Sequence, residues 1–289
     1  MQLNLPSPIE SYSFRGRDIF VKRDDQIDND FSGNKARKFH YFLDNDFSEI
    51  DSVVSYGSSQ SNAMYSLSVL SKMRGWRYEY FVDHIPSYLA DNPHGNYAKA
   101  IDNGMSIIEG ELPTTLPSST LMIEEGGRQA EAEYGIAILA DEIVEWADTQ
   151  GYDRLNVFLP SGTGTTALFL QRNLPEHIRV YSCACVGGDE YLRLQFDMLN
   201  PHRATHPEIL SIGKKHHFGK LYRENWKIWL ELRDSLGIEF DLLYDPLGWR
   251  VMMEHEWLCE APLLYIHQGG VLGNESMIPR YERKYKDMR

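Results

Sequence analysis

The chain has 289 residues, of which 42% are hydrophobic and 25% are charged, a composition that favours a packed core over global disorder. Its formal net charge of −13 makes nucleic acid a poor partner, because an acidic protein repels a phosphate backbone. The N-terminus lacks the pattern of a signal peptide, and no stretch approaches the ~20 apolar residues of a membrane span. We therefore expect no membrane partner and, by default, a cytoplasmic location.

Cysteine and histidine spacing argues against a disulfide framework or a metal site. The three cysteines, Cys183, Cys185 and Cys259, are odd in number, and the close pair has Cys-x-Cys spacing. His202 and His206 lie four residues apart, but neighbouring prolines crowd the segment. No metal is expected.

Short apolar runs alternate along the chain with longer helical patterns. The expected strands cover residues 19–24, 50–56, 78–83, 105–110, 155–160, 180–186, 239–245 and 263–267. The expected helices cover residues 36–45, 62–75, 133–150 and 166–174. Residues 85–97 and 111–119, which are rich in Pro, Asn and Ser, are expected to be loops.

This alternation predicts an α/β fold with mostly parallel sheets built from βαβ units. We expect a large domain formed by residues 1–44 and 126–289, with a smaller α/β domain inserted at 45–125. Ligands of open α/β sheets bind beyond the carboxyl ends of the strands, so the strand-to-helix turns are the places to search for chemistry.

The first such turn is FSGNKARKF, in which Ser32 and Asn34 are N-cap residue types. Lys35 then falls in the first helical turn, where the helix dipole disfavours a cation. That position lowers the pKa of the amine and favours a neutral nucleophile. Lys38 adds positive charge nearby. The alternative is an ordinary surface helix start with basic residues.

The second turn, SYGSSQSNAM, joins a strand to a helix that is expected to begin at about Asn62. Ser58, Ser59, Ser61 and Asn62 offer several donors at a helix N-terminus, which suits a carboxylate or a phenolate oxygen. The alternative is an ordinary N-cap within a polar loop.

The third turn, LPSGTGTTALFL, leads from an apolar strand into an apolar helix. Its glycines allow a close backbone approach, and its hydroxyl and N–H groups can bind a phosphate at the positive helix end. The turn lacks the sequence patterns of a nucleotide P-loop and of a dinucleotide fold, so it suggests a phosphate monoester. The residues concerned are Ser161, Gly162, Thr163, Gly164, Thr165 and Thr166. The alternative is a tight structural turn.

Taken together and in this order, the three turns resemble the 1-aminocyclopropane-1-carboxylate (ACC) deaminase / D-cysteine desulfhydrase family. That family belongs to the tryptophan-synthase-β-like, fold type II enzymes that use pyridoxal 5'-phosphate (PLP). The resemblance covers most of the chain and includes GNYAKAIDNGMSI, EEGG, YDP and YIHQGGVLG. It implies two open, mostly parallel α/β domains with PLP in the cleft between them, commonly in a homodimer.

The resemblance also implies roles for individual residues. Lys35 would form the Schiff base with PLP and later move protons, and Lys38 would lie near the cofactor phosphate. Asn62 would contact the ring hydroxyl oxygen, and the Ser161–Thr166 turn would hold the phosphate. Ser61 would bind the substrate carboxylate, together with Ser59 and Gln60.

Two departures from the family pattern concern the substrate and the pyridine ring. Gly248 or Trp249 stands where the family carries a substrate-site tyrosine, and Trp249, with Tyr244 and Arg250, is a candidate to line the substrate pocket. Gln268 stands in place of a threonine and is expected to be a neutral partner of the pyridine nitrogen. Both changes argue against ACC ring opening and leave PLP binding untouched.

The expected function is therefore that of a PLP-dependent deaminating lyase, which converts a small amino acid into a 2-keto acid and ammonia. Three alternatives remain open. One is another fold type II reaction, such as β-replacement or racemisation. A second is a PLP-binding relative that has lost turnover. The third is a nucleotide- or sugar-phosphate enzyme that uses the Ser161–Thr166 turn.

Overall fold

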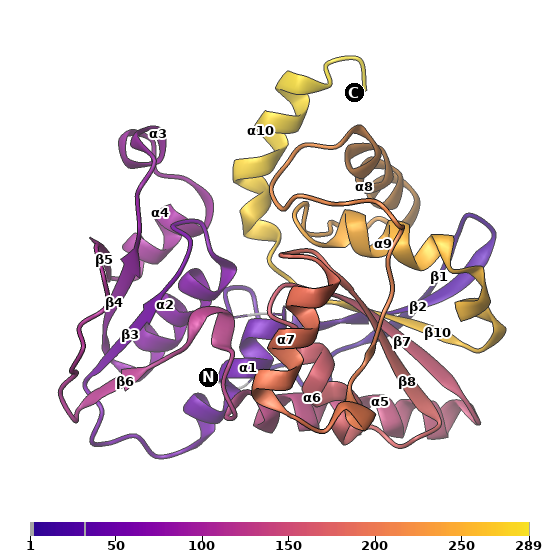
Figure 1. Ribbon diagram of the computed structural model, residues 1–289, viewed down its shortest axis with the longest axis horizontal. Coiled ribbons are helices and arrows are strands. Elements are labelled where there is room, and N and C mark those ends of the chain that lie inside the picture. The colour runs from indigo at the N-terminus through magenta and orange to yellow at the C-terminus, as the bar shows by residue number, and fades with distance from the viewer. Residues whose placement is uncertain (1–2, 32, 289) are drawn as a thin grey trace.

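The computed structural model describes residues 3–31 and 33–288, and this part of the chain contains two β-sheets (Figure 1). The larger has six strands in the order β1 (Ile9–Phe14), β2 (Arg17–Arg23), β10 (Leu263–His267), β7 (Leu155–Ser161), β8 (Ile178–Ala184) and β9 (Glu208–Ile209). The smaller has four, in the order β5 (Met105–Glu109), β4 (Arg77–Val82), β3 (Ser52–Tyr56) and β6 (Thr120–Met122). All pairings are parallel except β1 with β2.

Helices cover both faces of the larger sheet and pack against the smaller sheet (Figure 1). They are α1 (Gly33–Asp44), α2 (Asn62–Arg74), α3 (Ser87–Asp91), α4 (Gly95–Asp102), α5 (Ala132–Gln150), α6 (Thr165–Asn173), α7 (Asp189–Leu199), α8 (Arg223–Leu236), α9 (Asp245–Glu254) and α10 (Asn274–Lys284). Short 3-10 helices cover Asp24–Gln26, Glu125–Gly127, Arg203–Thr205, Glu256–Glu260 and Val271–Gly273. Within the described residues, no helix combines the length and the apolar character that crossing a membrane requires.

Every expected strand is present except 239–245, which is irregular up to the start of α9. Its backbone groups bond to side chains instead of to a neighbouring strand. Trp229 and Asn274 donate to the carbonyl of Phe240 at 2.7 and 2.9 Å, and the Leu242 N–H donates to Asn274 at 2.8 Å. These bonds satisfy the polar groups that a sheet would otherwise pair.

The expectation that residues 85–97 form a loop is wrong, because α3 and the start of α4 lie there. Leu89, Tyr97 and Ala100 are buried in the core beside the smaller sheet. Tyr97 and Ala100 are three residues apart and therefore share one helix face. The polar residues around them obscured this short apolar stripe in the sequence.

The larger sheet is buried on both faces, which explains why its strands are apolar almost throughout. Along β7, Phe158 faces the core formed with α8 and α9, whereas Val157 and Leu159 face the core formed with α5 and α6. The smaller sheet lies within residues 45–125, and the two domain boundaries stay a prediction.

A buried ion network fixes α1 against the larger sheet. Arg37 on α1 contacts Asp24, which directly follows β2, and Glu142, which lies on α5, both at 2.7 Å. Lys22 on β2 contacts Glu142 at 2.5 Å and donates to the carbonyl of Ser7 at 2.6 Å. The opposite face of α1 packs its phenylalanines, Phe39 and Phe42, into the core of the smaller sheet. Helix α1 therefore contacts both cores.

Candidate functional site

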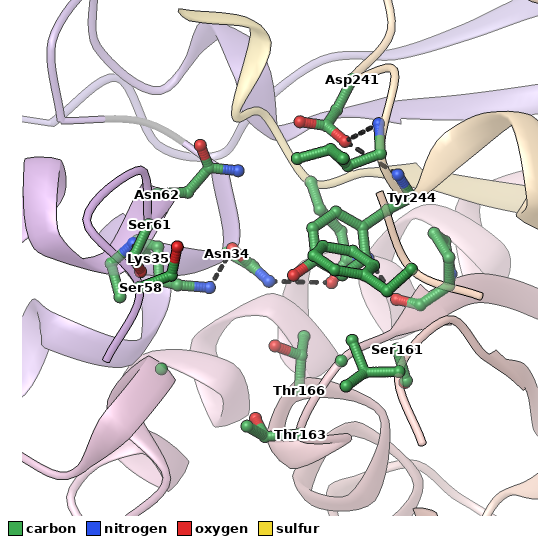
Figure 2. Close-up of a pocket in the computed structure, with 18 of the residues that line it drawn as sticks. Asn34, Lys35, Ser58, Ser61, Asn62, Ser161, Thr163, Thr166, Asp241 and Tyr244 are labelled. Atoms are coloured by element: carbon green, nitrogen blue, oxygen red, sulfur yellow. Dashed lines mark hydrogen bonds between the residues drawn. The ribbon is translucent and has the colours of Figure 1, made fainter. Parts of the chain in front are cut away.

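The three turns singled out in the sequence surround one cavity of about 430 Å³ (Figure 2). The segments after β3, β7 and β10 and the start of α1 all contribute to its wall. Predicted site residues on this wall are Lys35, Lys38, Gln60, Ser61, Asn62, Ser161, Gly162, Thr163, Gly164, Thr165, Thr166 and Gln268. Two predicted residues, Ser59 and Trp249, are not on it.

Lys35 lies in the first turn of α1, and its amine faces the cavity. Burial lowers the pKa of this amine to about 8, an effect that the Asp241 carboxyl partly opposes. The amine donates a hydrogen bond to the Asn34 side-chain oxygen at 3.2 Å. Asn34 lies inside α1, and Ser32, the other expected N-cap residue, is outside the described residues. A substantial neutral fraction near neutral pH makes Lys35 a nucleophile.

The start of α1 lies against the segment that follows β10. The Asn34 N–H donates to the Gln268 carbonyl at 3.0 Å. Gly33 has a φ of +64°, and a Cβ at this position would lie 1.9 Å from the Gln268 carbonyl oxygen. Only glycine permits this close approach, which brings Lys35 and Gln268 onto the same wall.

Gln268 lines the cavity, but its amide already has partners. Its Nε2 donates to the Pro160 carbonyl at 2.6 Å, and its Oε1 accepts from Asn34 at 3.1 Å. The amide is thereby held in one orientation between the end of β7 and the start of α1. Its predicted contact with a pyridine nitrogen stays a prediction.

The turn after β3 offers polar groups at the start of α2. Ser61 is the N-cap, and its hydroxyl oxygen accepts from the N–H groups of Ala63 and Met64 at 3.1 and 3.4 Å. Burial raises the pKa of Tyr80, and a hydrogen bond from the Ser61 side chain partly opposes this rise, so the Ser61 hydroxyl also faces Tyr80. Ser58 is on the wall, whereas Ser59 is buried with 7% exposure and off the wall. The geometry therefore favours Ser58 over Ser59 as a substrate contact.

Asn96 on α4 holds this turn in place, a role that the sequence analysis missed. Its Nδ2 donates to the Asn62 Oδ1 at 2.6 Å and to the Gln60 carbonyl at 3.1 Å. The Asn62 oxygen is thus engaged, and its Nδ2 lies beside the Asp241 carboxyl, where burial raises the pKa of Asp241 and the Asn62 amide partly opposes this rise. Reading 85–97 as a loop hid this residue, because Asn96 was not expected to lie on a helix that packs beside α2.

The Ser161–Thr166 turn joins β7 to α6 and has the features of an anion site. The Thr166 hydroxyl is buried and has no hydrogen-bond partner among the described residues. The hydroxyls of Thr163 and Thr165 are 3.1 Å apart. The Ser161 hydroxyl is instead engaged with Ser182 at 2.7 Å, and the Ser161 carbonyl accepts from the Cys185 N–H at 2.9 Å. Free N–H groups at the start of α6 complete a site for a phosphate.

Lys38 places a buried amine beside this turn. Its amine donates to the Gly126 carbonyl at 2.9 Å, and a Cβ on Gly126 would lie 3.2 Å from the Thr163 methyl group. Burial, reinforced by the charges of Lys35 and Arg128, lowers the pKa of Lys38 well below its ordinary value. A bound dianion would favour the charged ammonium form of Lys38, so this buried amine suits a phosphate site.

Asp241 places a carboxyl in the cavity wall that the sequence analysis did not identify. One oxygen accepts from the N–H groups of Leu243 and Tyr244 at 2.7 and 2.8 Å, and the other is buried without a partner among the described residues. Burial raises its pKa to about 6. An acidic residue inside an apolar run was the available signal, but the strand assignment of 239–245 concealed it.

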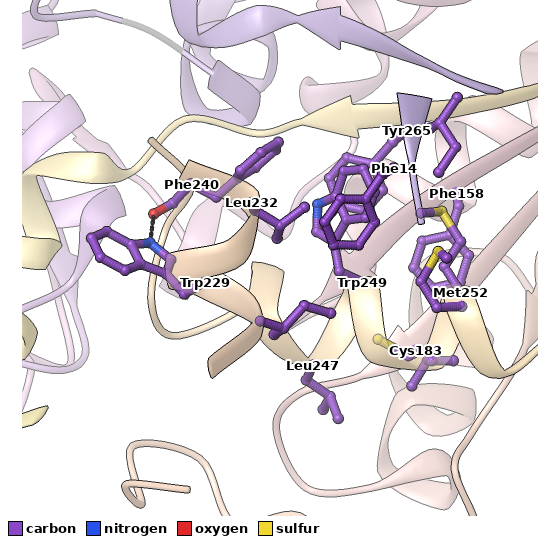
Figure 3. Close-up of a cluster of buried hydrophobic side chains, with 14 of the residues drawn as sticks. Phe14, Phe158, Cys183, Trp229, Leu232, Phe240, Leu247, Trp249, Met252 and Tyr265 are labelled. Atoms are coloured by element: carbon purple, nitrogen blue, oxygen red, sulfur yellow. Dashed lines mark hydrogen bonds between the residues drawn. The ribbon is translucent and has the colours of Figure 1, made fainter. Parts of the chain in front are cut away.

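The expectation that Trp249 lines the substrate pocket is wrong. Its side chain is fully buried and packs edge-on against Phe14 and Phe240, with ring centroids 5.3 and 5.5 Å apart (Figure 3). Helix α9 turns this residue into the hydrophobic core. Arg250 also points elsewhere and donates to Asn225 at 2.7 Å. Of the three candidates in this segment, only Tyr244 is on the cavity wall.

Gly248 also differs from the expected substrate position. A Cβ there would lie 3.0 Å from the Tyr265 hydroxyl and 3.1 Å from the Pro160 Cβ. This tight packing leaves no room for a tyrosine side chain. Packing between α9 and β7 therefore accommodates glycine at position 248 and not the tyrosine of the family pattern.

No protein-family model and no curated protein matches the sequence. Solved structures do match. An ACC deaminase homologue has a TM-score of 0.81 at 20% identity, with 98% of this chain and 95% of that chain covered. This is the tryptophan-synthase-β-like fold, PLP fold type II. The predicted fold is thus confirmed.

Two further structures show how widely this fold is used. A PLP-dependent aspartate racemase has a TM-score of 0.61 at 12% identity, over 91% of this chain and 90% of that chain. Cysteine synthase from Entamoeba histolytica has a TM-score of 0.65 at 14% identity, over 91% of this chain and 85% of that chain. Because these reactions differ, the fold leaves the reaction to be argued from the site.

Proposed function

We propose that this chain is a PLP-dependent deaminating lyase that converts a small amino acid into a 2-keto acid and ammonia. The observation that carries the proposal is the meeting of three groups around one cavity: the Lys35 amine, the Ser61 turn and the Ser161–Thr166 turn. The solved ACC deaminase homologue, which shares the fold over nearly the whole chain, supports the same reaction class.

The residues present fit PLP. The unpartnered Thr166 hydroxyl, the N–H groups at the start of α6 and the buried Lys38 amine suit its phosphate. Lys35, with a pKa of about 8, suits its aldehyde. The Asn62 Nδ2 suits its ring oxygen, since Asn96 already occupies the other end of that amide. When bound, PLP would stabilise negative charge on the substrate carbon.

The chain's own residues would then bind the substrate and move protons. The Ser61 hydroxyl and the N–H groups of its turn would bind the carboxylate at the start of α2, where the helix dipole favours an anion. The Lys35 amine would take the proton from Cα. Enclosure of the cavity would limit water and strengthen both interactions.

A screen for keto-acid release tests the proposal. The purified protein, supplied with PLP, is incubated with both enantiomers of cysteine and serine and with ACC. We expect a keto acid and ammonia from at least one amino acid that carries a β-leaving group. Borohydride-treated protein is the control. An inverted enantiomer without keto acid would indicate racemisation instead, and no product from any substrate would contradict a lyase.

The pH dependence of cofactor uptake provides a second prediction. Only a neutral amine attacks an aldehyde, and the lowered pKa of Lys35 makes its neutral form available at a lower pH than for an ordinary lysine. We therefore expect the rate of PLP uptake by the cofactor-free protein to rise with pH and to level off above about 8. Stopped-flow absorbance measures this rate, with free lysine as the control. A rate that still rose near pH 10 would contradict the assignment of an amine with this lowered pKa.

A further inference from the structure

Two tyrosines line the cavity within the described residues, Tyr191 and Tyr244. The Tyr244 ring lies over the Ser161–Thr166 turn: a Cβ on Gly162 would be 3.3 Å from the ring edge and 3.4 Å from the hydroxyl oxygen. Figure 2 draws Tyr244 across the cavity from Lys35 and Ser61. A phenol thus faces the amine and the N-cap turn from the opposite wall.

The backbone and ring of Tyr244 are both held in place. Its N–H donates to Asp241 at 2.8 Å, and its carbonyl accepts from the Gly248 N–H at 3.1 Å. The ring packs against Phe218, with centroids 5.1 Å apart. These contacts direct the hydroxyl, yet the hydroxyl has no hydrogen-bond partner among the described residues. A positioned phenol without a partner is suited to act on a ligand.

The phenol also stays protonated at working pH. Burial, reinforced by the Asp241 carboxyl, raises the pKa of Tyr244 far above its ordinary value. The group is therefore a hydrogen-bond donor and a proton donor. Asp241 is less suited to this task, because its unpartnered oxygen lies beside Gly270 and Asn62, whereas the Tyr244 ring lies against the Ser161–Thr166 turn.

We propose that Tyr244 is the catalytic acid that protonates the leaving group on the substrate's β-carbon. This inference rests on the proposed lyase function and adds a proton donor to it. It also explains how the site works without a tyrosine at Gly248: the phenol comes from four residues earlier, at the entry to α9 rather than within it.

The step balances in protons and electrons. Lys35 takes the Cα proton, and the electron pair of the Cα–H bond forms a double bond to Cβ. In the case of serine, the pair of the Cβ–O bond leaves with the hydroxyl oxygen. The Tyr244 O–H gives its proton to this oxygen, which departs as water, whereas a thiolate is too weak a base to take a proton from this phenol. The phenolate then recovers a proton from the Lys35 ammonium, directly or through water, which restores both groups.

Tyr244→Phe with two substrates tests the role, because the change removes only the hydroxyl. Serine loses hydroxide, which needs an acid, whereas β-chloroalanine loses chloride, which does not. Both enantiomers of each are used. We expect the variant to bind PLP and to lose about 100- to 10,000-fold in kcat on serine, while kcat on β-chloroalanine stays within a few-fold of the parent. Tyr152→Phe, which lies outside the cavity, is the matched control.

Other outcomes overturn the inference. Equal losses on both substrates, or none, would exclude a role in leaving-group departure, and loss of PLP colour would make Tyr244 a cofactor ligand instead. A serine-specific loss in Tyr191→Phe alone would assign the acid to the other wall tyrosine. If the parent protein deaminates no amino acid that carries a β-leaving group, the proposed function itself fails, which is visible before any variant is made.

Discussion

A Lys35→Ala variant is expected to lose the yellow colour of bound PLP and all measurable keto-acid release. The reason is that Lys35 combines a lowered pKa with a position on the same cavity wall as the Ser61 and Ser161–Thr166 turns. Removing a covalent nucleophile costs a factor of about a thousand or more in kcat. Absorbance before and after borohydride, followed by mass spectrometry of the reduced protein, measures whether the cofactor is attached at this residue.

The control separates the loss of this amine from the loss of any lysine. Lys227→Ala removes an exposed lysine on α8, away from the cavity, and should retain both colour and turnover. Lys35→Arg keeps the charge but cannot form the covalent bond, so it should be as inactive as Lys35→Ala. A yellow, borohydride-sensitive Lys35→Ala protein would assign the cofactor to another amine, of which Lys38 is the nearest candidate on the wall.

Asp24→Asn is expected to be the most destabilising single change outside the cavity, with a loss of about 3–5 kcal/mol in the free energy of unfolding. Asp24 is 1% exposed and contacts Arg37 at 2.7 Å, and it also accepts from Ser7 at 2.6 Å. The neutral variant leaves two buried cations, Arg37 and Lys22, with one carboxylate, Glu142. Urea denaturation monitored by circular dichroism measures the change.

The same network predicts the response to acid. Burial disfavours ionisation of Asp24, but the charge and hydrogen bonds of Arg37 outweigh it and hold the pKa of Asp24 below its ordinary value. A lowered folded-state pKa stabilises the protein above the unfolded pKa, and this contribution is lost as pH falls through the folded value. The variant should therefore lose less stability on acidification than the parent.

Asp197→Asn is the matched control for this pair of predictions. Asp197 contacts Arg203 at 2.7 Å, but Arg203 is 77% exposed, so water screens the pair and its removal should hardly move the urea midpoint. An equal shift for Asp24→Asn and Asp197→Asn would show that burial of the network contributes nothing.

The fold was accessible from the sequence because its strands are covered on both faces. Continuous apolar runs such as 155–160 and 263–267 have few other structures available, and helices with clear apolar stripes lie between them. Edge elements were not accessible. Strand β9 has two residues and β6 has three, which is too short for a periodic signal.

In the candidate site, too, residues set by local sequence could be predicted, whereas residues set by long-range contacts could not. Lys35, Ser61 and the Ser161–Thr166 turn belong to local strand-to-helix turns, so their residue types and order predicted them. Asp241 and Asn96 act through contacts across the fold; the local signal for Asp241 was only an acidic residue inside an apolar run, and Asn96 had none. Trp249 failed as a prediction because α9 packs this side chain into the hydrophobic core, and which face of a helix meets the core depends on contacts across the fold.

The contact between Gly33 and the Gln268 carbonyl has a consequence for sequence change over time. Any side chain at position 33 would meet backbone atoms of the opposite strand end, which cannot move aside as a flexible side chain can. Substitution there would have to be preceded by a shift of the whole segment after β10, and that shift would carry Gln268 away from Asn34. Descendants of this sequence that keep the site are therefore confined to glycine at position 33.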